Sequence, residues 1–320
     1  MKRTSYPRPV SRSLKVASVV SIAMAALILA AMHRGRTLRA TQALRELPRT
    51  ARAVLRIDTE ALGRTAAAQL LIDVFVAEEQ LSEIESVCGL DPLSALSEVT
   101  VWVRGPEDQP FQSIGLMLRG RGVDAATLAE CHRLLVEARG GSIVRLEGPV
   151  GPLLASRDRR SAIALLDDRT IVTGSVRTVA EAMAVRLGTA PALIDRPPIA
   201  TLWPRVNADA SVAAVLDPPE HWKSALERVA KLGHQASAVQ GLQRIALSVP
   251  TGSTHSVELY IDVATVELAI QDAAVIRGWT ASPPESVEAP WTDVLRSAVV
   301  QVRERTIVVT LDVSSLSKPR

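Results

Sequence analysis

The chain is poor in the residues that most often stack on bases, bind metals or carry out catalysis. Its 320 residues include two cysteines, five histidines and only five Trp, two Tyr and two Phe. Binding of single-stranded nucleic acid needs aromatic stacking platforms beside a clustered basic surface. Nine aromatic side chains are too few to supply such platforms, so we expect no nucleic-acid partner.

Acidic residues are missing from the first 40 positions. That stretch carries eight Lys and Arg residues and no Asp or Glu. The other 29 basic residues are therefore outnumbered by all 34 acidic ones, and residues 41–320 carry a net charge of about −5. The basic pI of the whole chain comes from its N-terminal flank, which again argues against nucleic acid.

One long run lacks charge altogether. Residues 16–32, VASVVSIAMAALILAAM, would span about 25 Å as a helix, which is the short end of the range for a transmembrane helix. Lys15 and Arg34 can extend this helix by snorkelling, which predicts membrane lipid as its partner. The alternative is a cleaved export signal. An anchor is favoured because the run exceeds the usual 7 to 15 residues or so, and because Ala23 and Ala25, the clear A-x-A pair, lie inside it.

The charges around this run bear on topology. Five Lys and Arg residues precede it and four follow within fifteen residues. We expect residues 1–15 to form a cytoplasmic basic tail and 16–32 a single-pass signal anchor in the inner membrane, with the C-terminal region periplasmic. A secreted protein with a cleaved signal is the alternative.

Alternating apolar residues predict strands beyond a polar stem, residues 33–50, which ends at Pro48. Val99, Val101 and Val103 face one way, and the same pattern at 114–118 predicts the other strand of a hairpin. A helix ending at Cys88 precedes this hairpin, with Gly89 as its stop signal, and a helix capped by Asp124 follows it. The second helix carries Leu128, Cys131 and Leu135 on one face and ends at Gly140 and Gly141. Strands near 53–58 and 142–147 complete the order β-α-β-β-α-β within residues 51–148.

The same order recurs in residues 207–314. Strands are expected at 210–216, 242–249, 256–263 and 306–313, with helices at 220–232 and 265–277. Pro290 is expected to open a further helix, whose apolar face comprises Trp291, Val294, Leu295, Ala298 and Val302. Residues 149–206 form a connecting hairpin and helices, and 315–320 a tail.

We therefore predict an α+β protein with two tandem split-βαβ (ferredoxin-like) units behind a transmembrane helix. One continuous sheet fits the pattern nearly as well.

No motif in the chain predicts catalysis, metal binding or a cofactor. Neither G-x-S-x-G nor H-E-x-x-H occurs. Ser253 and His255 lie in an expected turn, where Ser is an ordinary residue. Adjacent Cys131 and His132 would point about 100° apart on a helix, so one metal ion cannot bind both.

A G-x-G-x-x-A pattern at 120–125 resembles a dinucleotide loop, and Glu147 ends the next strand. However, Asp124 would place an anion where a phosphate should lie. We interpret Asp124 as a helix cap and expect no cofactor.

The two cysteines lie on the apolar faces of two helices that would cover the same face of a sheet. That arrangement can bring their Cα atoms within the roughly 4.4 to 6.8 Å that a disulfide needs. Two buried free thiols in a reducing compartment are the alternative; export would favour a Cys88–Cys131 bridge.

The stretch Cys88-Gly89-Leu90-Asp91-Pro92 adds a resemblance. Followed by strands that end in Arg104-Gly105 and Arg119-Gly120 and by the helix with Cys131, it resembles an uncharacterised family of exported bacterial envelope proteins. The likeness covers roughly residues 54–313 and is specific over 88–148. It implies export and a bridge between the two cysteines, and no activity. The apparent anchor is a departure from that family.

Two functional classes follow. The favoured one is a non-enzymatic binding or structural component of the cell envelope, with an envelope protein as a candidate partner beside lipid. The alternative is an envelope hydrolase or other enzyme whose residues converge only in the fold. A pocket with two or more His, Asp, Glu or Ser side chains within hydrogen-bond reach would favour the enzyme.

Overall fold

The computed structural model describes residues 41–62, 78–105, 113–148, 150–207, 210–218, 241–251, 255–283, 289 and 291–317. The transmembrane segment predicted at 16–32 and the helix predicted at 220–232 lie outside these ranges. None of the helices in the described ranges is both long enough and apolar enough to cross a membrane.

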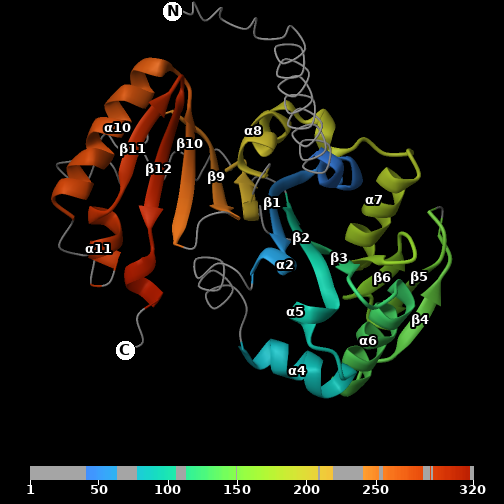
Figure 1. The fold of residues 1–320 in the computed structure, drawn as a ribbon. Coiled ribbons are helices and arrows are strands. Elements are labelled where there is room, and N and C mark those ends of the chain that lie inside the picture. The colour runs from blue at the N-terminus through green and yellow to red at the C-terminus, as the bar shows by residue number, and fades with distance from the viewer. Residues whose placement is uncertain are drawn as a thin grey trace, which may run out of the picture.

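Twelve strands of the described chain form one sheet, and every neighbouring pair runs antiparallel (Figure 1). Their order is β11-β12-β10-β9-β8-β1-β2-β3-β7-β6-β5-β4. The first seven strands in the chain are β1 (Ala51–Asp58), β2 (Leu96–Arg104), β3 (Ser113–Gly120), β4 (Ile143–Leu146), β5 (Leu153–Ser156), β6 (Ala162–Leu165) and β7 (Thr170–Gly174). The last five are β8 (Ala210–Leu216), β9 (Leu242–Pro250), β10 (Ser256–Val263), β11 (Val299–Arg303) and β12 (Thr306–Asp312).

The sheet contains a repeat. From its centre it runs β1-β2-β3-β7-β6 in one direction and β8-β9-β10-β12-β11 in the other. Each half places one helix after its third strand, α6 (Ala125–Ala138) in the first half and α10 (Val266–Ala281) in the second. The halves join where β1 pairs with β8, at Val54 and Val215 among others. The α+β class is therefore confirmed, and the strand order recurs between the halves. The helix predicted at 220–232, which the full predicted order needs, lies outside the described residues.

The hairpin predicted at 99–103 and 114–118 is present as β2 and β3, but the split-βαβ pairing predicted around it is wrong. In a split-βαβ unit, the two strands that flank a helix run parallel with another strand between them. Here β1 and β2 are direct antiparallel neighbours, with Leu55 opposite Val101, and β8 and β9 pair in the same way. The result is one continuous sheet. Side-chain alternation determines which residues face the core, but it carries no information on which strand lies next to which.

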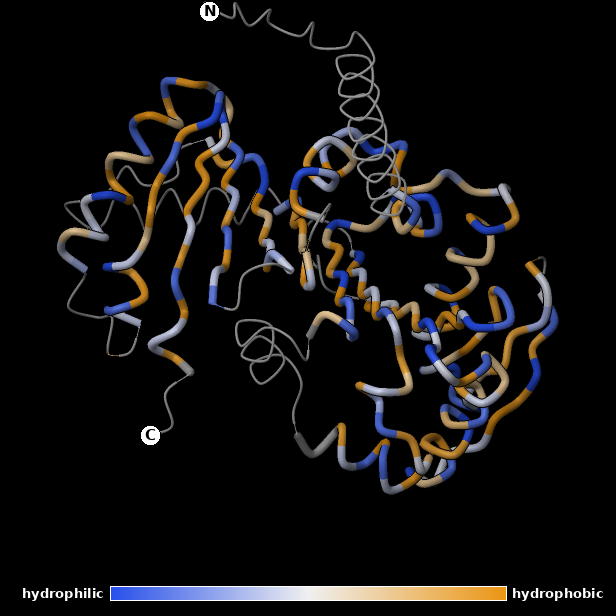
Figure 2. Tube along the Cα trace, in the orientation of Figure 1, coloured by the Kyte–Doolittle hydropathy of each residue, from blue (hydrophilic) through white to orange (hydrophobic). Residues whose placement is uncertain are grey.

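Helices cover both faces of the sheet. One face packs against α7 (Val176–Arg186) and α8 (Pro197–Asn207) through the largest cluster of buried apolar residues, which includes Trp102 and Trp203. The other face packs against α6 in the first half, and against α10 and α11 (Trp291–Arg296) in the second. Figure 2 shows hydrophobic stretches along the strands with hydrophilic positions among them, as expected where helices cover part of each face. The shorter elements are α2 (Thr59–Leu62), α4 (Glu78–Cys88), α5 (Pro92–Ala95), η1 (Leu193–Asp195) and η2 (Ser314–Ser317).

Part of the predicted polar stem belongs to the fold. Residues 41–46 are helical, and Leu44 and Leu47 are fully buried in the largest core cluster. The Leu47 carbonyl accepts a hydrogen bond from the Leu193 N–H, and Pro48 forms a β-bridge with Ala192. The prediction that the folded region begins after Pro48 is therefore wrong. Little in the sequence indicated this, because the neighbours of the two leucines are mostly polar.

The helix predicted from Pro290 to about Val302 is also wrong in its second half. It ends at Arg296 as α11, and β11 follows, with Val300 opposite Val309 and Val302 opposite Ile307. Three valines in five residues favour a strand once an unpaired edge is available, because β-branched side chains pack well on a pleated surface.

Candidate functional site

The predicted disulfide is present. Cys88 and Cys131 are bonded, their Cα atoms lie 5.1 Å apart, and the bridge joins the end of α4 to the middle of α6. Arg139 and Glu83 tie the same two helices a second time, through hydrogen bonds of 3.0 and 2.5 Å between the guanidinium and the carboxylate. The C-terminal half of α6 is thus held at two points.

Local signals in the sequence set the two ends of α6. The Asp124 carboxylate accepts a hydrogen bond of 2.8 Å from the Thr127 N–H, and this bond lowers the pKa of Asp124. At the other end Gly140 adopts φ +77°, and the Gly141 N–H donates to the Val136 carbonyl. Both predicted boundaries are confirmed.

The G-x-G-x-x-A stretch serves packing here. A Cβ atom on Gly120 would lie 2.1 Å from the Val123 carbonyl oxygen, so the first glycine is required by the turn itself. Asp124 is engaged as the helix cap. Glu147, the candidate ribose ligand of that pattern, forms an ion pair of 2.7 Å with Arg145.

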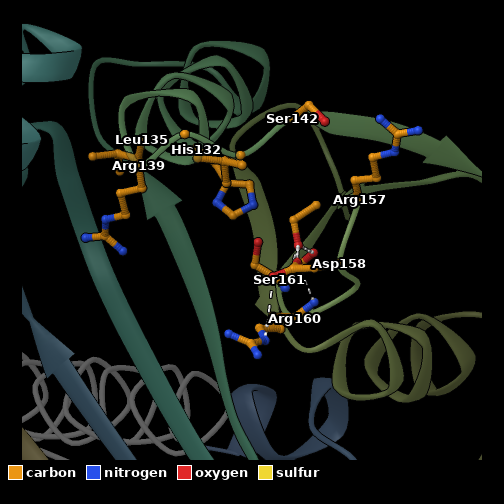
Figure 3. Close-up of a pocket in the computed structure, with 12 residues that line it drawn as sticks. His132, Leu135, Arg139, Ser142, Arg157, Asp158, Arg160 and Ser161 are labelled. Carbon is orange, nitrogen blue, oxygen red and sulfur yellow. Dashed lines mark hydrogen bonds and ion pairs between the residues drawn. The ribbon is translucent and has the colours of Figure 1, made fainter.

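A half-open groove of about 950 Å³ lies beside the C-terminal end of α6 (Figure 3). One wall is the last two turns of α6, with His132, Leu135, Val136 and Arg139. The opposite wall is the turn between β5 and β6, residues 156–161. The groove therefore exists because the β4–β5 pair brings this turn to the end of the helix.

The β5–β6 turn has an ordered polar framework. The Ser156 hydroxyl donates to Asp158 Oδ1 at 2.6 Å and accepts a hydrogen bond from the Ser161 N–H at 3.0 Å. The Arg160 N–H donates to the same Asp158 oxygen at 3.1 Å. These bonds, the one from Ser156 above all, lower the pKa of Asp158, so the carboxylate is ionised and largely satisfied within the turn.

His132 contributes a half-buried imidazole. Its ring points into the groove in Figure 3, and its Nε2 atom has no hydrogen-bond partner among the described residues. Burial lowers the pKa of His132 below its usual value, so the ring is neutral at neutral pH.

Three arginines stand around the rim (Figure 3). Arg139 is paired with Glu83, whereas Arg160 has only a long contact, 3.6 Å from its Nε to Asp158. Arg157 is exposed and forms no ion pair or side-chain hydrogen bond with any residue that the structure describes. The groove thus carries an excess of positive charge.

A pocket with two His, Asp, Glu or Ser side chains within hydrogen-bond reach would favour an enzyme, and the distance between Ser156 and Asp158 meets that condition. Their chemistry does not suit nucleophilic catalysis, because a carboxylate with a lowered pKa is a weak base and the Ser156 hydroxyl is engaged within its own turn. Within the described ranges, no three His, Cys, Asp or Glu side chains are close enough together to hold a metal ion.

The other sequence candidates lie apart from the groove. Ser253 falls outside the described residues. The His255 carbonyl accepts a hydrogen bond from the Val313 N–H at the end of β12, in the other half of the sheet. Sequence reasoning missed the groove, although the run Ser156-Arg-Asp-Arg-Arg-Ser161 and the seven-residue spacing of His132 and Arg139 were the available signals.

A smaller hollow of about 310 Å³ lies in the second half, with Arg205, Tyr260 and Arg303 on its walls. The Tyr260 hydroxyl donates to Glu258 at 2.5 Å, and burial together with this carboxylate raises the pKa of Tyr260. The lining of this hollow includes the acid Glu304 as well as the two arginines.

Comparison with known proteins identifies no family for the chain. No family model matches it, and no curated protein matches it. Among solved structures it is similar to crystal forms III, I and IV of TP0453, with 11%, 11% and 9% identity and TM-scores of 0.44, 0.46 and 0.46. These matches cover 85% of this chain and 94 to 95% of TP0453.

Proposed function

We propose that this protein is a non-enzymatic binding component of the cell envelope, held at the inner membrane by residues 16–32 with its folded region on the periplasmic side. The uncharged run with its basic N-terminal flank supports the tether. The Cys88–Cys131 bridge supports the compartment, since disulfides persist in oxidising environments. The resemblance at Cys88–Pro92 to exported bacterial envelope proteins points the same way.

The proposal of a binding function rests on the groove. This groove is concave, it combines the apolar side chains of Leu135 and Val136 with polar and charged groups, and its size falls within the usual range for small-molecule sites of about 300 to 1,000 Å³. Its hydroxyl and carboxylate groups are occupied in holding the turn, which suits a site that recognises a ligand without transforming it.

Reporter fusions at the C-terminus test the placement. A reporter that is active only in the periplasm should be active when fused after Arg320, and a cytoplasm-only reporter should be silent. Deleting residues 16–32 is the matched control and should reverse both signals, because the export segment is then gone. Activity of the cytoplasm-only reporter on the intact chain would overturn the proposed topology.

Hydrolysis at Ser156 is the second candidate function, supported by the 2.6 Å contact with Asp158. The test is a panel of ester and phosphoester substrates with the wild type, Ser156→Ala and, as the control, Ser282→Ala at an exposed position outside the groove. We expect no turnover above background in any of the three. Turnover that Ser156→Ala abolishes and Ser282→Ala retains would establish an enzyme and refute the binding-only proposal.

A further inference from the structure

The positive charge of the groove is not balanced within it. Arg157 has no partner in the described chain, its exposed neighbour Arg159 has none either, and Arg160 makes only the 3.6 Å contact with Asp158. Asp158, the one acid of the groove, is satisfied by Ser156 and by the Arg160 N–H. Three guanidinium groups in one short turn therefore lack a counterion of comparable strength.

Neutral donors lie beside these charges. The Ser142 and Ser161 hydroxyls form no hydrogen bond with any residue that the structure describes, and both serines line the groove. Guanidinium groups together with hydroxyls are the donors that proteins use for phosphate and carboxylate oxygens, since charge-assisted hydrogen bonds are about twice as strong as neutral ones.

We propose that this groove binds the oxyanion of a phosphate-bearing organic ligand, with Arg157, Arg160 and the Ser142 and Ser161 hydroxyls as donors. In Figure 3 the two guanidinium groups point to opposite ends of the groove, so these exposed side chains turn toward the ligand when it binds. The proposal rests on the proposed binding function and names its ligand class. A bare phosphate would fill only a small part of 950 Å³. Leu135 and Val136 on the α6 wall provide an apolar surface for the rest of the ligand.

One feature opposes an anion here, because the C-terminus of α6 carries a partial negative charge of about half a unit. Its last carbonyls are already hydrogen-bonded: the Arg139 N–H donates to Leu135, and the Gly140 and Gly141 N–H groups donate to Glu137 and Val136. Two to three full positive charges on the facing turn outweigh a half charge that is capped in this way.

The experiment is calorimetric titration of the purified full-length protein in detergent. Inorganic pyrophosphate and the soluble headgroup glycerophosphoglycerol are the probes, at two salt concentrations. Arg157→Gln/Arg160→Gln should weaken binding about tenfold or more, as the loss of charge-assisted hydrogen bonds implies. The matched control is Arg121→Gln/Arg145→Gln, which removes the same charge from exposed positions that do not line the groove.

A second measurement, the pKa of His132, reports whether the anion binds in the groove. His132 faces Asp158 and Arg160 on the turn and Arg139 on its own helix, and an anion bound among them should raise the pKa of its imidazole, measured from its ring proton resonance. Binding of either probe with these effects supports the proposal, and the tighter probe identifies a free polyphosphate or a lipid headgroup as the source.

The proposal that the groove binds a phosphate-bearing ligand would be overturned if neither probe bound, or if the groove variant and the control variant lost affinity equally. Because the titration uses purified protein, such a result leaves the membrane placement untouched, and the fusions test that separately.

Discussion

The two halves of the sheet share one plan and differ in what is built on it: among the described residues, the first half carries the groove of about 950 Å³ and the second a hollow of about 310 Å³. In both halves three antiparallel strands lead into a helix, α6 or α10, and then into an outer hairpin, β6–β7 or β11–β12. The first half alone inserts the β4–β5 pair between its helix and that hairpin. This insertion places the arginine-rich turn opposite α6, so the repeat supplies the scaffold and the insertion supplies the candidate site.

The halves also differ in how the helix is held. A disulfide and the Arg139–Glu83 pair fix α6 to α4. The second-half helix α10 is held by packing of Ala269, Ala273 and Ile276 against the sheet, with Arg277 donating to the Val300 carbonyl. A wall that borders a ligand site benefits from covalent fixing, because a small displacement there changes the contacts of the ligand.

Removing the bridge should have the largest effect. Cys88→Ala/Cys131→Ala should lower the free energy of unfolding by about 4 kcal/mol, as loop-closure entropy predicts for a 43-residue separation. Denaturant unfolding of the full chain in detergent measures it, and reduction of the wild type should give the same loss. If hydrogen exchange in the double variant speeds up as much in α10 as in α6, the bridge does not fix α6 selectively, and the proposed difference between the two halves is wrong.

Truncation of Leu44 should come next. This side chain is fully buried under the first half, so Leu44→Ala should cost about 2 to 5 kcal/mol. Gln42→Ala, at an exposed position two residues earlier, is the control and should change stability little. Equal, small effects of the two substitutions would show that residues 41–48 are a stem outside the fold.

The caps of the two equivalent helices should respond differently to pH. Thr265→Ala removes the α10 cap and should cost about 1 kcal/mol, most of which persists at low pH because the bond to the Leu268 N–H does not titrate, while the part due to the Thr265–Glu267 bond is lost. Asp124→Ala should destabilise at neutral pH only. The pKa of Asp124 is lowered in the fold, so its stabilisation is present above the unfolded pKa and disappears as pH falls through the folded pKa. Thermal unfolding from pH 7 to pH 2 measures this, and parallel profiles for the two variants would contradict it.

His132 should give the smallest effect. Burial lowers the pKa of this imidazole, so the unfolded chain takes up the proton first. Stability should therefore be full above the unfolded pKa of about 6.5 and should decline as pH falls toward the folded value. His132→Gln should flatten the profile in this window, while Gln42→Ala, which removes no ionisable group, should leave it in place. An unchanged slope in His132→Gln would show that other groups titrate there.

Local chemistry made much of the fold predictable. Gly89 at φ +65°, Asp124 at the N-cap, and the alternating valines of β2 each act within a few residues, and the elements they define appear where expected. The failures involve partners distant in the sequence. Alternation could not show that β1 lies beside β2, and Val299–Arg303 becomes a strand only because β12 offers an edge.

The groove could not be predicted from the sequence for the same reason. Arg157 and Arg160 look like ordinary turn residues in the sequence, and nothing local to them shows that His132 lies across from them. The strand β5, four residues without polar alternation, gave no period-two signal, and it is the element that positions the turn. The bridge was predicted because each cysteine lies on the apolar face of its helix and because export and the family resemblance favour a disulfide.

Thiol trapping in intact cells tests the central claim most directly, since it reports compartment and bridge together. Cells are treated with a membrane-permeant alkylating reagent before lysis, and the protein is digested without reduction for mass spectrometry. The account predicts no alkylated cysteine and a linked pair of peptides containing Cys88 and Cys131. Two alkylated thiols in freshly trapped protein would contradict it, because the folded region would then lie in a reducing compartment.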